Sequence, residues 1–144
     1  MSNIIDLSTA ASTARKLKKQ GNKIVLIHGC FDLFHQGHIE LFNFAQKLGI
    51  VFAGVDDDDS VKAIKGKTKP INPLKKRIDV IKQKGRVDFL FVLNPKDNYS
   101  RFFRNLYKDI SPDFLVTADD ENLSKRKRDI KGLGIKLIVM KKRT

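Results

Sequence analysis

The sequence predicts an α/β fold in which a mostly parallel, five-stranded sheet carries helices on both faces. Five short runs rich in Ile, Val, Leu and Phe recur along the chain, and each has the length of a strand and contains no proline. Segments with the 3.6-residue spacing of amphipathic helices lie between them. Alternating strands and helices indicate βαβ units, and near-continuous apolar strands indicate a sheet buried on both faces. With right-handed crossovers, such units build a doubly wound, Rossmann-like sheet.

The expected elements follow the chain in a regular order. The five strands are predicted at residues 23–27, 51–55, 89–93, 114–117 and 135–140. Helices are expected between them or before them, at about residues 8–19, 38–48, 73–81, 102–110 and 122–133. In a doubly wound sheet, ligands bind at the carboxyl ends of the strands, near the point where the strand order reverses. This rule draws attention to the segment that follows the first long strand.

Local signals mark where several helices begin and end. Gly49 is expected to stop the helix over residues 38–48. Asn72 is predicted as an N-cap, with Pro73 as the first helical residue after it. The four aspartates at 56–59 follow the second strand and form a turn, from which Asp59 or Ser60 would cap a short helix.

Composition narrows the class of protein. The chain has 144 residues, 29 Lys plus Arg against 16 Asp plus Glu, and a formal charge of +13. This length predicts one domain over residues 1–144, with residues 1–22 as an N-terminal helical extension. One cysteine, no secretory signal pattern and no apolar run of about 20 residues predict a cytoplasmic, non-membrane protein. The positive charge predicts an anionic partner, either nucleic acid or a phosphorylated small molecule.

All three histidines and the only cysteine lie within residues 28–38, HGCFDLFHQGH. His38 is expected to open a helix, where unpaired backbone N–H groups and the helix dipole favour a phosphate. His35, three residues earlier, would point at the same oxyanion. Gly29 and Gly37 would let a nucleotide approach the backbone closely.

The string G-x-F-D-x-x-H-x-G-H at residues 29–38 resembles the signature of the H-x-G-H nucleotidyltransferase superfamily, also called cytidylyltransferase-like. The stretches at 60–66 (SVKAIKG) and 69–73 (KPINP), with Arg77, are similar to the heptose-phosphate adenylyltransferases in particular. The stretch at 111–116 (SPDFLV) resembles a later strand of the family. Glycerol-3-phosphate cytidylyltransferase and archaeal FAD synthetase carry related patterns.

The resemblance implies a role for each matching residue. Histidines would bind the triphosphate and stabilise the charge of the transition state, and Lys65 with Arg77 would contact phosphates. The implied catalytic set is His35, His38, Lys65 and Arg77. The implied nucleotide-binding set is Gly29, Cys30, Phe31, Asp32, Gly37, Asp58, Asp119 and Asp120. No residue is assigned to a metal; Mg²⁺ or another divalent cation is expected to accompany the nucleoside triphosphate.

The implied reaction is transfer of a nucleoside monophosphate, AMP from ATP in the first instance, to a small phosphorylated acceptor. An acceptor phosphate oxygen attacks the α-phosphorus and pyrophosphate leaves, so positioning and charge neutralisation suffice without a nucleophilic side chain. A heptose-type sugar phosphate is the first acceptor hypothesis. CTP with glycerol 3-phosphate or another polyol phosphate is the second, and FMN is the third. Family resemblance also implies a homodimer.

Other interpretations of the same residues stay open. His28, Cys30, His35 and His38 have ligand types that suit zinc, although their spacing matches no common zinc finger. The positive charge permits a basic nucleic-acid-binding module, although the sequence shows no nucleic-acid-binding motif. The run at 125–128 (KRKR) is predicted as a solvated helix face, with a phosphate-gripping lid or a nucleic-acid patch as its functional alternatives. Phe102 and Phe103 are predicted as core residues.

Two positions depart from the family's pattern. The given sequence stops at residues 141–144, about where the family carries a phosphate-binding segment rich in Ser and Thr, and Ala118 stands where the family prefers glycine. An inactive relative that only binds nucleotide is therefore an alternative. The choice between ATP and CTP also stays open.

Overall fold

The computed structural model describes residues 3–95, 99–118 and 122–141, and its framework is a six-stranded sheet. The strand order is β1-β4-β3-β2-β5-β6, and every pair of neighbouring strands is parallel. The strands are β1 (Asn3–Ile4), β2 (Ile24–Gly29), β3 (Ile50–Asp56), β4 (Phe89–Leu93), β5 (Phe114–Ala118) and β6 (Lys136–Met140). The predicted parallel α/β sheet is confirmed, and all five expected strands are present.

The sixth strand, β1, corrects the predicted strand count. It has two residues, Asn3 and Ile4, which pair with Phe89 and Leu90 at the edge of the sheet. Two residues are too few to show a period of two, which is why the sequence pattern did not indicate a strand there. The N-terminal extension is therefore not only helical, because it also contributes this edge strand.

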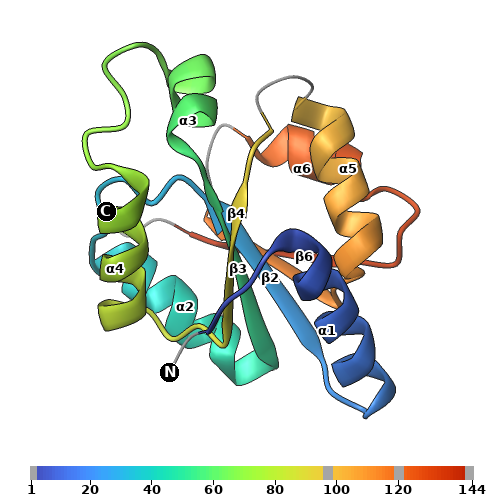
Figure 1. Ribbon diagram of the computed structural model, residues 1–144. Helices are drawn as coiled ribbons and strands as arrows, with labels where there is room; N and C mark the ends of the chain where they lie inside the picture. Colours follow the sequence, from blue (N-terminus) through green and yellow to red (C-terminus); the bar gives the residue numbers. More distant parts are fainter. Residues whose placement is uncertain (1–2, 96–98, 119–121, 142–144) are drawn as a thin grey trace.

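Helices cover both faces of the sheet (Figure 1). On one face lie α2 (Gln36–Leu48) and α4 (Leu74–Lys84), and on the other lie α1 (Leu7–Lys19), α5 (Tyr99–Ile110) and α6 (Leu123–Ile130). The short helix α3 (Asp58–Lys65) follows β3 at the carboxyl edge of the sheet. Within the described residues, no helix combines the length and the apolar character that a membrane crossing requires.

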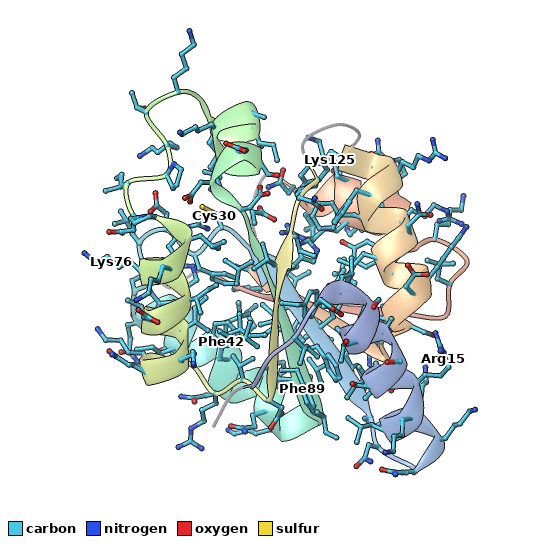
Figure 2. The ribbon with its side chains drawn as sticks, in the orientation of Figure 1. Arg15, Cys30, Phe42, Lys76, Phe89 and Lys125 are labelled. Atoms are coloured by element: carbon cyan, nitrogen blue, oxygen red, sulfur yellow. The ribbon has the colours of Figure 1, made fainter. Side chains whose placement is uncertain are left out.

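Each face of the sheet has its own hydrophobic core. Along β2, Val25 and Ile27 pack with α2 and α4, whereas Ile24 and Leu26 pack with α1 and α5. This alternation follows from the two-residue period of a strand, and it explains why β2 is apolar at every position from 24 to 27. Phe42 lies between its helix and the sheet in Figure 2, while charged side chains such as Lys76 and Arg15 project outward.

The N-caps of α3 and α4 differ from those predicted, and α2 begins at Gln36, two residues before the predicted His38. Asp57, and not Asp59 or Ser60, caps α3 by accepting a hydrogen bond from the backbone N of Ser60 at 2.9 Å. The N-cap of α4 is Pro73. Asn72 does not cap α4, because its side chain donates to the backbone oxygen of Asp32 at 2.6 Å. The predicted C-terminal stop of α2 at Gly49 is confirmed.

The strand order reverses at β2. From β2 the chain passes outward to β3, and it later returns to β5 on the opposite side of β2. The space above the carboxyl ends of β2 and β5 is thus the point where a doubly wound sheet binds its ligand. The loop after β2, which carries the histidine-rich motif, lies at this point.

Candidate active site

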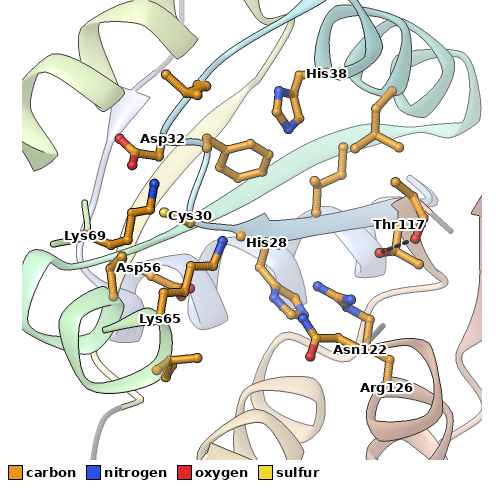
Figure 3. Close-up of a pocket in the computed structure, with 18 of the residues that line it drawn as sticks. His28, Cys30, Asp32, His38, Asp56, Lys65, Lys69, Thr117, Asn122 and Arg126 are labelled. Carbon is orange, nitrogen blue, oxygen red and sulfur yellow. Dashed lines mark hydrogen bonds between the residues drawn. The ribbon is translucent and has the colours of Figure 1, made fainter. Parts of the chain in front are cut away.

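A pocket of about 370 Å³ opens at the carboxyl ends of β2, β3 and β5. This volume falls within the usual size of small-molecule sites, about 300–1,000 Å³. Four of the predicted nucleotide-binding residues line it, together with two of the predicted catalytic residues. These six are Gly29, Cys30, Phe31, Asp32, His38 and Lys65. Figure 3 shows that His38 and Asp32 lie on one side of the pocket, and that Asp56 and Lys65 face it from another.

His35 and His38 are fixed by the first turn of α2. His35 is the N-cap, and its Nδ1 accepts a hydrogen bond from the backbone N of Gly37 at 3.0 Å. The backbone N of His35 donates in turn to Nδ1 of His38 at 3.2 Å, and the two rings stack with centroids 4.0 Å apart. Because Nδ1 of His38 is an acceptor, the proton of its neutral ring is assigned to Nε2. His38, unlike His35, lines the pocket.

Burial and nearby positive charge keep His38 neutral. Partial burial of the ring, His35 and the ammonium of Lys65 together lower the pKa of His38 to about 4. At neutral pH the ring is therefore a hydrogen-bond donor through Nε2 and carries no charge of its own. Lys65, the last residue of α3, supplies positive charge to the same pocket, and Lys69 also lines it.

Gly37 has a structural role that differs from the predicted one. A Cβ at this position would come within 2.8 Å of Cε1 of His35, closer than real contacts allow. The glycine therefore leaves room for the His35 ring, and it does not line the pocket. Phe31 has a φ of 54°, in the left-handed region, and its ring contacts His38 edge-on at a centroid distance of 5.4 Å.

Asp32 ties the histidine loop to the segment before α4. Its carboxylate accepts hydrogen bonds from the backbone N of Ile71 at 2.7 Å and of Asn72 at 2.8 Å. Although desolvation raises the pKa of Asp32, these two bonds and the charge of Arg77 lower it more, and the net shift is downward. Both carboxylate oxygens therefore already accept hydrogen bonds from the backbone of the protein.

Arg77 lies beneath the pocket and not in it, which does not support its predicted contact with phosphates. Its side chain is 0% exposed, and its Nη1 donates to the backbone oxygens of Cys30 at 2.8 Å and Asp56 at 2.7 Å. Its Nε donates to the backbone oxygen of Asn72, and its Nη2 pairs with Asp58 at 2.6 Å. The guanidinium therefore joins the ends of β2 and β3 to α3 and α4.

Three further predictions have different outcomes. Asp58 pairs with Arg77 and does not line the pocket, so the structure does not support its predicted role in nucleotide binding. Cys30 is buried, and burial raises the pKa of its thiol, as suits a packed residue and not a nucleophile. Asp119 and Asp120 lie outside the described residues.

The α5 and α6 side of the pocket carries His28, which the sequence indicated only as a candidate zinc ligand, and Arg126, which it did not place in the site. His28 is buried, its Nε2 lies 2.7 Å from the hydroxyl of Tyr107, and its ring stacks on Phe103 at 4.4 Å. Burial and the charge of Arg126 lower the pKa of His28 well below its usual value. Arg126 itself is 8% exposed and lines the pocket. It therefore differs from the predicted solvated face, whereas Lys125, Lys127 and Arg128 are exposed.

The four candidate zinc ligands do not converge. His28 faces α5, whereas the His35 ring packs against His38 at the start of α2. Among residues 3–95, 99–118 and 122–141, no group of three or more His, Cys, Asp or Glu side chains is arranged to hold a metal ion.

Comparison with known proteins agrees with this geometry. The family described as cytidylyltransferase-like matches residues 26–142. The chain belongs to this family. The predicted resemblance is thereby confirmed, and the cytidylyltransferase-like match includes the histidine loop, α3 and β6.

Several curated relatives are similar to this cytidylyltransferase-like chain. The bifunctional protein HldE of Desulfatibacillum aliphaticivorans is 37% identical over 111 residues, which is 76% of this chain and 22% of HldE. The HldE of Pasteurella multocida is 40% identical over 104 residues, 72% of this chain and 21% of that protein. The chain thus spans less than a quarter of the length of these two relatives.

Solved structures share the fold. A lipopolysaccharide core biosynthesis protein from Thermoplasma volcanium GSS1 superposes with a TM-score of 0.65 and 24% identity, over 86% of this chain and 98% of its own. A pantoate-β-alanine ligase from Francisella tularensis superposes with a TM-score of 0.74 and 17% identity, over 100% of this chain and 68% of its own. These likenesses show that the chain shares its fold with both proteins.

Proposed function

We propose that this chain is a nucleotidyltransferase that transfers a nucleoside monophosphate to a small phosphorylated acceptor and releases pyrophosphate. The observation that carries the proposal is the neutral His38 ring at the N-terminus of α2. Its Nδ1 is occupied by the backbone of His35, and its Nε2–H is available to a phosphate in the pocket. The family match supports the same reaction class.

In this reaction an acceptor phosphate oxygen forms a bond to the α-phosphorus, and the bond from that phosphorus to pyrophosphate breaks. His38 donates a hydrogen bond to the phosphoryl oxygens, where negative charge develops. Lys65 and Lys69, which line the same pocket, neutralise the phosphates. The backbone of Gly29, Cys30 and Phe31 borders the nucleotide.

We assign Arg77, Asp58 and Asp32 to positioning. The Arg77 network fixes the two strand ends that form the floor of the pocket, and Asp32 fixes the loop above it. His35 acts through His38, because its backbone N sets the orientation of that ring. Asp119 and Asp120 stay predicted neighbours of the base.

A divalent cation binds together with the nucleotide substrate in the proposed reaction. Mg²⁺ is usually bound through one or two carboxylates and the phosphates of its ligand, so a cluster of three protein ligands is not required. Its contribution is to neutralise charge on the triphosphate. We therefore treat Mg²⁺ as part of the nucleotide substrate.

The similarity to HldE and the matching stretches at 60–66 and 69–73 favour ATP with a heptose-type sugar phosphate. CTP with a polyol phosphate, and ATP with FMN, are the second and third substrate pairs. A homodimer and a cytoplasmic location stay predictions, as does the description of residues 1–144 as one domain.

The test is a screen for pyrophosphate release. The four nucleoside triphosphates are combined with a panel of sugar phosphates, glycerol 3-phosphate and FMN, in the presence of Mg²⁺, Mn²⁺ or Co²⁺. Release with at least one pair supports the proposal. Nucleotide binding without release from any pair would instead identify an inactive relative, and the enzyme proposal would fail.

A further inference from the structure

Asp56, the last residue of β3, has a buried carboxylate oxygen without a partner. The residue is 9% exposed and lines the pocket, where Figure 3 shows it on the same side as Lys65. Its Oδ1 has no hydrogen-bond partner within the described part of the chain. Buried acceptors are normally paired, so an unpaired oxygen on a residue that lines a pocket indicates a missing donor.

The surroundings of Asp56 restrict which donor fits. Its backbone oxygen is held by Arg77, and positive charge from Arg77, Lys65 and Arg126 acts on its carboxyl. A metal ion or an ammonium group bound there would be repelled by these three cations, and an anion would be repelled by the carboxylate. A neutral hydroxyl group meets neither obstacle.

The carboxylate is available to accept such a hydrogen bond. Burial is the largest influence on Asp56, and it raises the pKa of the carboxyl to about 6 in spite of the neighbouring cations. Above this pH the group is ionised, and hydrogen bonds to an ionised acceptor are stronger than those between neutral groups.

The position of Asp56 relates it to the acceptor and not to the nucleotide. The nucleotide is expected where the strand order reverses, between β2 and β5. Asp56 ends β3, on the other side of β2. Lys65 lines the same pocket as His38 and Asp56, and its charge acts on both side chains. An acceptor whose phosphate contacts His38 and Lys65 would therefore extend toward Asp56.

We propose that Asp56 accepts a hydrogen bond from a hydroxyl group of the sugar or polyol phosphate acceptor. The inference rests on the proposed function and deepens it by assigning a residue that recognises the acceptor. It distinguishes such acceptors from aminoalcohol phosphates, whose ammonium group would enter a region of positive charge.

The first test compares Asp56→Asn with a matched control, Asp79→Asn. Asp79 is a surface carboxylate, 53% exposed, whose ion pair with Lys75 stays within α4. Asp56→Asn keeps the size of the side chain and removes its charge. The KM for the sugar or polyol phosphate is expected to rise about tenfold to a hundredfold, the range for a hydrogen bond to a charged group. The KM for the nucleotide is expected to stay within about twofold, and Asp79→Asn to change neither.

A second test links Asp56 to a hydroxyl group and also works on the unaltered protein. Glycerol 3-phosphate and its deoxy analogues, or a sugar phosphate and its deoxy analogues, are compared on both proteins. Removal of the contacting hydroxyl is expected to raise the acceptor KM of the natural chain. It is expected to raise the acceptor KM of Asp56→Asn little further, because the two changes delete the same interaction. Phosphoethanolamine is expected to be a poor acceptor for the unaltered protein.

The outcomes separate this inference from the proposed function. If pyrophosphate is released but the acceptor KM is unchanged in Asp56→Asn, the inference is wrong and the function stands. A rise in the nucleotide KM alone would also overturn the inference. If no substrate pair reacts, the proposed function is wrong. Calorimetric binding of glycerol 3-phosphate and the sugar phosphates then tests the role of Asp56 by itself. Binding that Asp56→Asn weakens at least tenfold supports the inference, and equal binding or no binding to the unaltered protein overturns it.

Discussion

The backbone N of His35 donates a hydrogen bond to Nδ1 of His38, so the helix N-cap itself orients the ring that faces the pocket. The ring of His35 is held in turn by the backbone N of Gly37. The spacing H-x-G-H thus meets a local geometric need: two rings that stack at 4.0 Å, with a glycine between them where a Cβ would clash. The motif fixes a hydrogen-bond donor at a helix terminus, where we propose that a phosphate binds.

The first prediction concerns the ionisation of the histidines. His38 in the ligand-free protein is expected to titrate near pH 4, and His28 to stay neutral well below its usual pKa of 6.5. The unfolded chain binds protons on both rings below about pH 6.5, so their contribution to stability is complete above that pH and is lost as the pH falls toward 4. NMR titration of the ring protons measures both values. Midpoints near 6.5 would contradict the burial of the two rings.

Asp56 changes stability with pH in the opposite direction. Its pKa is raised to about 6 in the folded protein, from the ordinary value of 3.8. Its contribution to stability is therefore present below about pH 4 and is lost as the pH rises through 6. In Asp56→Asn, the unfolding free energy between pH 4 and 6 is expected to fall more steeply on acidification than in the natural chain. Denaturant unfolding at several pH values measures this, and equal slopes would show that the carboxyl is not buried as described.

The second group of predictions concerns the Arg77 network. Arg77→Met removes a fully buried cation and leaves the oxygens of Cys30, Asp56 and Asn72 without their donor. The free energy of unfolding is expected to fall by about 3–5 kcal/mol, as for other broken buried pairs. Arg86→Met, at an exposed position directly after α4, serves as the control and is expected to change stability by less than about 0.5 kcal/mol. Similar losses in both variants would show that the Arg77 network is not structural.

Asp32 gives a prediction for the loop. Asp32→Ala removes the acceptor for the backbone N–H groups of Ile71 and Asn72. The free energy of unfolding is expected to fall by about 1 kcal/mol, because these bonds are only partly buried. Backbone amide exchange at Ile71 and Asn72 is expected to accelerate, while exchange in β3 stays as in the natural chain. Unchanged exchange at both amides would contradict the bonds to Asp32.

The fold was largely predictable because buried parallel strands carry near-continuous apolar runs. Both β2 and β3 show this pattern, and both were located correctly from composition and length. β1 was missed because a strand of two residues has no period. The N-caps were less predictable. The Asn72 side chain donates to the backbone oxygen of Asp32, 40 residues away in the chain, and a local pattern does not show this contact.

The candidate site was predictable where the motif is local. The loop and His38 depend on neighbours within a few residues, so the sequence pattern contains their geometry. The family resemblance assigned Arg77 to phosphates. The sequence cannot show that its N–H groups instead reach the backbone oxygens of Cys30 and Asp56. Asp56 was hidden in a run of four aspartates, of which only this one ends a strand and lines the pocket.

The role of Arg126 in lining the pocket was likewise not evident from the sequence, because Arg126 lies within a basic run. It is buried, whereas the cationic residues on either side are exposed. One signal could have identified it: Arg126 follows Leu123 by three residues and precedes Ile130 by four, so it shares the helix face that packs on the sheet. A charged residue at such an apolar position of a helix is therefore a candidate for lining a pocket.

The most direct test of the central claim measures pyrophosphate release by His38→Ala with the substrate pair that the screen identifies. Gln46→Ala, an exposed position on the same helix, is the matched control. The loss of one preorganised donor is expected to lower kcat by about a hundredfold to a thousandfold, while the control stays within about twofold. Release by His38→Ala at the rate of the natural chain would contradict the account.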